Sequence, residues 1–330
     1  MTLSLPARAG RGRLAETRPM GRFVLSRLLS GLPTLIGMSL IGFAVVSLAP
    51  GDPVAMELRA MGVVASPEDV AALRAEYGLD RPFLIRWLDW LGRAATLDFG
   101  RSIATGRSVA AEIGLHLPAT LALAISGLIG AILLSLALGV GAASGGLVGG
   151  LLRAATVLLV SAPSFWLALL LIDAFVLRLG WARLVGDGSL RDLALPALTL
   201  SLATGAALGR VVCERVRAEM AEDHVRLAIA KGLGPRAILL GHVAPGIVGP
   251  LATAWASAFG ALLGGAVIVE SIFGWPGLGR LALQAIAQRD YPVLQAYLVL
   301  MGLAYFVTSL IADIAVVLAD PALRRRLGDG

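Results

Sequence analysis

Long apolar stretches alternate with shorter, arginine-containing segments along almost the whole chain. Six stretches reach the length of about 20 residues that an α-helix needs to cross a bilayer core. The prolines in or beside the third and fourth stretches are tolerated in membrane helices where neighbours satisfy the freed carbonyls. The pattern predicts an all-α membrane protein with six transmembrane helices, at approximately 24–49, 117–143, 154–177, 193–213, 246–271 and 294–319.

The segment between the first two stretches is predicted to carry two short helices. Ser66, Pro67 and Asp69 have the pattern of an N-cap, a proline at the first helical position and a capping-box acid, and Gly78 is a stop signal. A second helix is expected after Pro82, with a broad apolar face that must pack on the membrane surface or on the transmembrane helices. Its aromatic content favours an interfacial position. That face comprises Phe83, Leu84, Trp87, Leu88, Trp90 and Leu91.

The distribution of cationic residues predicts the orientation. With the N-terminus inside, the cytoplasmic segments hold fifteen Arg and Lys residues and the short outside loops hold five, which satisfies the positive-inside rule. We therefore expect a cytoplasmic tail at 1–22, a first transmembrane helix at 23–49 and a periplasmic segment with short helices at 50–116. A five-helix transmembrane core at 117–320, containing a cytoplasmic loop at 214–250, and a cytoplasmic tail at 321–330 complete the chain.

Composition supports a membrane location. The chain is 57% hydrophobic and 15% charged, with a mean hydropathy of +0.83, whereas soluble domains are roughly 45–50% apolar and about 25% charged. Its net charge of +6 comes mainly from arginines that flank the apolar runs, which indicates anionic lipid and not nucleic acid as the charged partner. A cleavable signal peptide ending near Ala49 is the alternative for the start, but the first apolar run is too long for one.

The residue types and their spacing offer little support for catalytic or cofactor chemistry in this chain. Cys213 is the only cysteine, and the three histidines show no metal-ligand spacing. Lys231 is the only lysine and does not follow a phosphate-binding glycine loop. A membrane enzyme would need a nucleophile with a base, paired carboxylates or a metal set, and none is visible. We expect no catalytic residue, no metal and no cofactor in this chain, so any ATP must be hydrolysed by another chain.

The cytoplasmic loop at 214–250 has the most distinctive pattern. Gly232, Gly234 and Pro235 must interrupt a helix, which predicts two short helices. Between Arg226 and Arg236, a surface of small residues could enter a groove on a partner protein. An ordinary basic loop is the plainer alternative, whereas a passive channel would not explain a glycine-broken helix pair.

Four separated motifs share one resemblance. The sequence VRLAIAKGLGPRAILLGHVAPGIVGP resembles the EAA loop of permease subunits of ABC importers, in the form found in the dipeptide, oligopeptide and nickel permease family. LAPGDP at 48–53, SAPSFWLALLLI at 161–172 and ESIFGWPGLGRLALQAIAQRDYPVLQA at 270–296 are similar to the same family. The motifs occur in the family's order, and the resemblance extends from about residue 23 to 326.

The resemblance implies the type I importer permease fold and a coupling helix that docks into a groove of an ATPase subunit. Pro245 and Gly246 depart from the family's usual Arg-Asn pair after the histidine that His242 matches, and Gly249 replaces a leucine. The positions to which the coupling loop maps are Arg226, Ala228, Ala230, Lys231, Gly232, Leu233 and Pro250.

The resemblance also implies partners and cargo. The expected partners are a second homologous permease, two ATPase subunits that hold ATP and Mg²⁺, and a periplasmic or lipid-anchored solute-binding protein at a bacterial inner membrane. Peptides are the expected cargo of the translocation pathway. Nickel, another metal chelate or an opine-like solute is the alternative, since the short loop at 178–192 is more similar to that of nickel-type members.

Several residues inside the predicted spans are candidates for the pathway or its gate. Asp173 and Asp313 are ionisable groups within spans, which are functional candidates by default, although pairing near a span end is the plainer account. Small residues of the fifth span, 260–261 and 264–266, suit helix packing within the subunit or across a permease dimer. The pathway or gate candidates are Phe165 and Trp166, for which packing is the alternative, and Glu270, Trp275 and Pro276, where Glu270 could instead pair with Arg280.

Overall fold

A computed structural model describes residues 17–48, 66–76, 79–181 and 192–319, with residues 54, 58, 62 and 183 as isolated positions. Within these residues every regular element is helical. The predicted stop at Gly78, most of the two predicted tails and much of the loop at 178–192 lie outside the described residues. The helices are α1 (Thr17–Ser47), α3 (Pro67–Glu76), α4 (Phe83–Ala95), α5 (Val109–Ala143), α6 (Gly146–Ser161), α7 (Ser164–Leu171), the π-helix η1 (Ile172–Arg178), α8 (Ala194–Met220), α9 (Asp223–Ala230), α10 (Pro235–Ile238), the π-helix η2 (Leu239–Val243), α11 (Ala244–Ile272), α12 (Leu278–Gln288) and α13 (Tyr291–Ala319).

Among the described residues, five helices are long and apolar enough to cross a membrane, and the number is six if a bent pair counts as one span. The expected helix boundaries were too narrow at three places, because a helix continues past its apolar run until a cap or a breaker ends it. The first begins at Thr17, and α8 continues to Met220. Helix α5 begins at Val109, where the Ser108 side chain accepts a hydrogen bond from the Ala111 amide.

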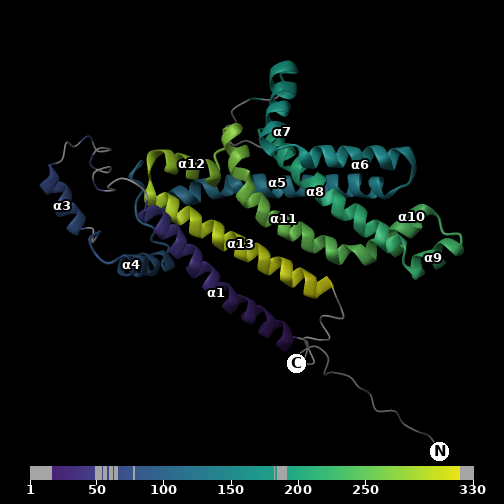
Figure 1. Ribbon diagram of the computed structural model, residues 1–330, viewed down its shortest axis with the longest axis horizontal. Coiled ribbons are helices and arrows are strands. Elements are labelled where there is room, and N and C mark those ends of the chain that lie inside the picture. The colour runs from purple at the N-terminus through teal and green to yellow at the C-terminus, as the bar shows by residue number, and fades with distance from the viewer. Residues whose placement is uncertain are drawn as a thin grey trace, which may run out of the picture.

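The third predicted span, expected as one helix at 154–177, is broken. Helix α6 and the α7–η1 segment meet at 104°. Proline disfavours helical geometry in the residue before it, and Ala162, which precedes Pro163, is extended with φ −80° and ψ 125°. In Figure 1 α6 lies along α5 and α8, whereas α7 turns away from them. The steric effect of Pro163 therefore breaks the helix, although the hydropathy of 154–177 predicts one continuous span.

The transmembrane helices approach one another through glycine. A Cβ on Gly139 of α5 would lie 2.4 Å from the Val212 side chain of α8, and one on Gly127 would lie 3.1 Å from Leu200. Since 127 pairs with 200 and 139 with 212, α5 and α8 run parallel. Figure 1 shows α11, α13 and α1 continuing the layer beside them. Small residues permit this close backbone packing in the absence of a strong hydrophobic driving force between helices.

The two short helices after α1 form as predicted. The Ser66 hydroxyl accepts a hydrogen bond from the Asp69 amide at 3.1 Å, and Asp69 accepts one from the Ser66 amide at 3.0 Å, which completes a capping box at the start of α3. Helix α4 packs on α1 by burying Trp87 and Trp90 against Phe43. Of the two surfaces expected for this helix, the transmembrane helices are therefore the one that receives both indoles.

Candidate functional site

Helices α9 and α10 form the predicted pair of short helices, at the end of the molecule opposite to α4 and α12 (Figure 1). Gly232 ends α9 with φ +77°. Its amide donates to the Ile229 carbonyl at 2.9 Å and the Leu233 amide donates to that of Ala228 at 3.3 Å, which is the Schellman arrangement. A Cβ on Gly232 would meet no atom within 4 Å. Backbone conformation, not space, therefore selects glycine at this turn.

One face of α9 is anchored in the protein and the other is free. Val225 and Ala228 are buried in a cluster that also contains Val212 and Val216 of α8 and Ile247 of α11. Other apolar side chains of this loop point outward, and Leu227 and Leu240 are 57% and 71% exposed. Exposed apolar groups beside a rigid backbone indicate a protein-docking surface. We call this the coupling face, which comprises Leu227, Ile229, Leu233 and Leu240.

Cations border the coupling face. Arg226 pairs with Asp223 at 3.6 Å between two solvated side chains, a contact worth little in water. Lys231 and Arg236 are exposed and have no ion pair with any described residue. Ala230 is also exposed, as is Pro250, which lies within α11 and not in the loop. The structure thus brings six of the seven predicted coupling residues together and leaves Pro250 apart.

The departure at Pro245 and Gly246 has a structural explanation. Pro245 lies in the first turn of α11, where its missing amide is not needed. A Cβ on Gly246 would lie 2.2 Å from Oε1 of Glu219, so a larger residue here would require this flexible side chain to move. Oε1 of Glu219 in turn lies 3.4 Å from Nε2 of His224. The glycine therefore lets the end of α8 contact both α9 and α11.

The loop is also held against the end of α5. Arg153 and Arg217 both donate to the Ala142 carbonyl, at 2.8 and 3.3 Å. These arginines come from α6 and α8, and the carbonyl belongs to the last turn of α5, where intrahelical partners are lacking. These contacts join the ends of α5, α6 and α8 beside α9.

Glu270 lies at the opposite end and is fully buried. It accepts a hydrogen bond from the Thr120 hydroxyl at 2.7 Å and one from the Arg280 amide at 3.0 Å. Thr120 also accepts from the Leu278 amide at 2.7 Å. Arg280 thus contacts Glu270 through its backbone amide, whereas its guanidinium donates to the Gly274 carbonyl and not to the carboxylate with which a pairing was the expected alternative. This network ties α5, α11 and α12 together, and we call it the external corner.

The other pathway candidates lie in two places. Trp275 is buried in the external corner and donates to the Ala119 carbonyl at 2.9 Å, with the half-buried Pro276 beside it. Phe165 and Trp166 are 47% and 49% exposed at the start of α7, away from that corner. Trp275 and Pro276 thus pack with Glu270, whereas the Phe165–Trp166 pair does not.

The two acidic candidates inside the spans, Asp173 and Asp313, are paired. Asp173 accepts from Arg178 at 2.7 Å, and Asp313 lies 3.3 Å from the Arg27 guanidinium. Of the small residues in the fifth span, Gly260 packs on Thr308 of α13, whereas Gly264 and Gly265 are exposed. Pairing near a span end therefore accounts for both acidic residues.

Sequence reasoning did not identify Asp290 as a structural residue. Asp290 is buried and accepts hydrogen bonds from the Ser102 hydroxyl and from the amides of Ile103 and Ala104, the latter two at 3.2 and 3.3 Å. It thereby fastens the segment before α5 to the α12–α13 corner. Its partners lie more than 180 positions away in sequence, so no local signal could have revealed the contact.

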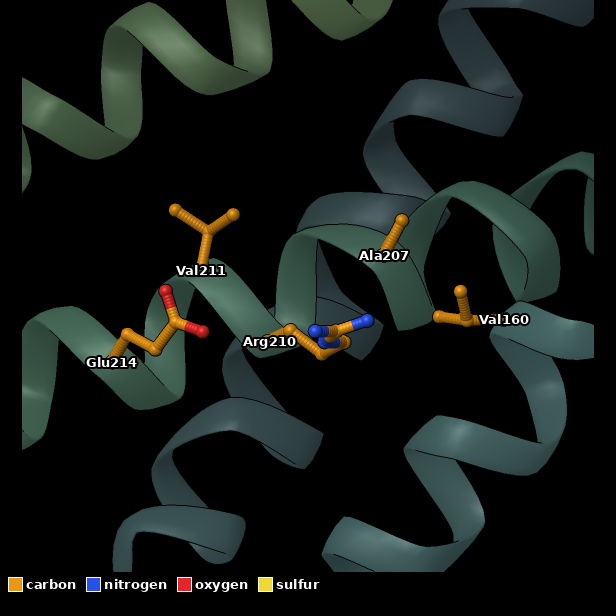
Figure 2. Close-up of a pocket in the computed structure, with 5 residues that line it drawn as sticks. All are labelled: Val160, Ala207, Arg210, Val211 and Glu214. Atoms are coloured by element: carbon orange, nitrogen blue, oxygen red, sulfur yellow. The ribbon is translucent and has the colours of Figure 1, made fainter.

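A small open pocket of about 240 Å³ was also not predicted from the sequence. Figure 2 shows it between α8 and the end of α6, lined by Val160, Ala207, Arg210, Val211 and Glu214. The sequence pattern had assigned Arg210 only to the cationic residues that orient the chain. The signal that could have pointed to this second role is the position of Arg210 on a membrane helix, one that continues to Met220.

Comparisons with known proteins agree with this architecture. Residues 131–325 match the family described as the inner membrane component of binding-protein-dependent transport systems, and residues 20–124 match the N-terminal part of such membrane components. The glutathione transport system permease protein GsiC of Salmonella typhimurium (strain LT2) is 34% identical over 307 residues, covering 92% of this chain and 99% of that protein. GsiC of Escherichia coli K12 gives the same identity and coverage.

A solved structure, the crystal structure of an amino acid ABC transporter with histidines, aligns with 65% of this chain and 94% of its own, at 20% identity and a TM-score of 0.46. The resemblance inferred from the four motifs is confirmed by the family and GsiC matches, and so is the prediction of a permease without enzymatic activity. The chain belongs to the inner membrane components of binding-protein-dependent transport systems, the multi-pass permease subunits of ABC importers.

Proposed function

We propose that this permease forms half of an ATP-driven import pathway for short peptides and that α9 transmits the work of ATP hydrolysis to it. The carrying observation is the coupling face, which exposes Leu227 and Ile229 on a helix whose opposite side is buried against α8 and α11, with Leu233 and Leu240 exposed after it. Unpaired Lys231 and Arg236 beside it suit carboxylates at the rim of a groove. An ATPase subunit is the partner that such a surface in this family would engage.

Both termini lie in the cytoplasm in this proposal. Six crossings return the chain to its starting side, and the excess of cations favours that side as the cytoplasm. The coupling loop then faces the ATPases, and α3 and α4 face the periplasm. Two ATPases, which hold ATP and Mg²⁺, a second homologous permease and a solute-binding protein complete the proposed transporter, and this chain contributes no cofactor.

Transport would proceed by alternating access between two packings of the helices. ATP binding closes the ATPases, draws the two coupling helices together and shifts the population toward an outward-open state. The contacts of Arg153 and Arg217 with Ala142 supply a path from α9 to α5, α6 and α8. The external corner stays closed on itself and moves with α11 and α12.

Peptide cargo is supported by the relationship to a glutathione permease. The test is uptake into proteoliposomes that contain this permease, its partner permease, the ATPases and the binding protein. We expect uptake of a labelled tripeptide that requires ATP and the binding protein and exceeds that of a nickel chelate. Uptake of the chelate alone would reassign the cargo, and uptake of either solute without ATP would contradict the importer function.

A further inference from the structure

The pocket between α6 and α8 contains an arginine and a glutamate that do not pair. Arg210 and Glu214 are exposed and one turn apart on α8, a spacing at which opposite charges meet on a helix surface. Neither has a hydrogen bond or ion pair within the described residues. Figure 2 shows the Arg210 guanidinium extending toward Val160 and the Glu214 carboxylate on the side of Val211. The two charges are therefore separate and both available to a ligand.

The pocket lies near the end of the membrane-spanning part of α8. Val212 packs against Gly139, four residues before α5 ends at Ala143, and Arg210 precedes Val212 on the parallel helix α8. At 1.5 Å per residue, Arg210 is about 15 Å from the last residue of α8. An ionisable group on a membrane-spanning helix is a functional candidate by default.

We infer that this pocket binds the charged ends of a short zwitterionic peptide, with Arg210 holding the carboxylate and Glu214 the ammonium group. The inference rests on the proposed function and names the site and the chemical class of the cargo. A guanidinium can bind a carboxylate through two parallel hydrogen bonds, and an ionised carboxylate accepts hydrogen bonds from an ammonium group. The apolar walls, Val160, Ala207 and Val211, leave room for the atoms between the charges.

The pocket volume limits what can enter. About 240 Å³ is small for a complete ligand site, since such pockets are typically about 300–1,000 Å³. The pocket is open, so a tripeptide would place its ends against α8 and leave its middle outside the pocket. The site is thus one half of a binding chamber, which agrees with a pathway formed by two subunits.

The test uses a reporter cysteine in the complete transporter. Cys213 is buried and is first replaced (Cys213→Ser), and Val160→Cys then places a thiol in the pocket wall. The rate of maleimide labelling is measured with trialanine, with its C-terminal amide and with its N-acetyl form. We expect trialanine to slow labelling and each capped form to bind about tenfold or more weakly, as loss of one charge-assisted contact predicts.

Substitution of each charge should remove one selectivity. Arg210→Gln should abolish the preference for the free carboxylate, and Glu214→Gln the preference for the free amine, whereas Arg215→Gln, on a neighbouring but different face of α8, should change neither. Arg210→Lys keeps the charge and should retain part of the carboxylate preference even if Arg210→Gln does not assemble. Labelling that ignores capping, an unreactive Val160→Cys, or equal losses for all peptide forms would overturn the inference.

Two controls distinguish peptide binding in this pocket from lipid binding there and from peptide uptake by another route. Labelling that responds to the phosphatidylglycerol content of the bilayer and not to peptide would overturn the inference in favour of a lipid headgroup. ATP-driven peptide uptake without protection of Val160→Cys would reject the site and leave the proposed function standing. Arg210-dependent protection without uptake would support the site and reject the proposed peptide import.

Discussion

The external corner and the coupling loop lie at opposite ends of the molecule and differ in whether their side chains find partners within this chain. At the external corner, Glu270 and Thr120 satisfy one another and the nearby amides, and the carboxylate is entirely buried. At the coupling loop, α9 turns out exposed leucines such as Leu227 and ends on a left-handed glycine. One end is complete within this chain, whereas the other requires a second protein. Changes at the first should therefore affect folding, and changes at the second should affect coupling.

The largest effect is expected at the external corner. Glu270→Ala should lower stability by about 3 kcal/mol or more, because the Thr120 hydroxyl and the Arg280 amide both lose a buried acceptor at about 1–3 kcal/mol each. Thermal unfolding of the purified permease in detergent measures this. Glu68→Ala on exposed α3 is the control and should change the midpoint little. A midpoint shift no larger than that of the control would show that the corner is not a structural centre.

The next effect is expected at the turn after α9. Gly232→Val puts a β-branched residue at φ +77°, which costs about 1–2 kcal/mol. This cost lowers the population of the observed loop conformation by about 5–30-fold. Uptake per ATP hydrolysed should fall by a similar factor while the amount of protein in the membrane stays constant. Gly234→Val is the matched control, since Gly234 has φ −70° and open space around its Cβ position. Equal losses in both variants would contradict a specific requirement at Gly232.

A smaller effect is expected where α8 meets α11. Gly246→Ala places a Cβ on the Glu219 carboxylate, and because this flexible side chain can move, the cost should stay below about 1 kcal/mol. The change should separate Glu219 from His224. In a double-mutant cycle with Glu219→Ala, measured by uptake, the two losses should not add. Additive losses would mean that Gly246 acts independently of Glu219.

The smallest effect is expected in α3. Hydrogen bonds from the Ser66 side chain and backbone hold the pKa of Asp69 below its ordinary value. A depressed carboxyl pKa means that the stabilisation of the cap is complete above the ordinary value of about 3.9 and is lost as the pH falls through the folded pKa. Amide exchange of α3 should be faster in Asp69→Asn than in wild type at pH 7, and the difference should vanish in acid, where the wild-type carboxyl is protonated and neutral. A difference that persists in acid would argue against the capping box.

Local signals predicted the parts of the fold that neighbours in sequence decide. The capping box at Ser66 and the break at Gly232 need only a few adjacent residues, and both form as expected. The bend at Pro163 was underestimated, because hydropathy marks an apolar run without reporting its backbone geometry. The family's motif order then identified the coupling loop on α9 and α10.

Tertiary partners could not be predicted in the same way. Glu270 meets Thr120 across 150 positions, and Asp290 meets Ser102 across 188. A single sequence contains no signal that joins such distant residues. The pocket at Arg210 could not be predicted for a related reason. An arginine near a span end satisfies the positive-inside rule, and only the packing of α6 beside α8 shows that Arg210 also lines a pocket.

The most direct test of the account is co-purification of the tagged permease from gently solubilised membranes, comparing wild type with Leu227→Asp. Leu227 is exposed and lies outside the buried cluster, so the variant should fold and retain the second permease. We predict that wild type recovers the ATPase subunits and that Leu227→Asp loses them. Equal recovery of the ATPases by both proteins, or their absence from both, would contradict the claim that α9 is the surface on which the ATPases dock.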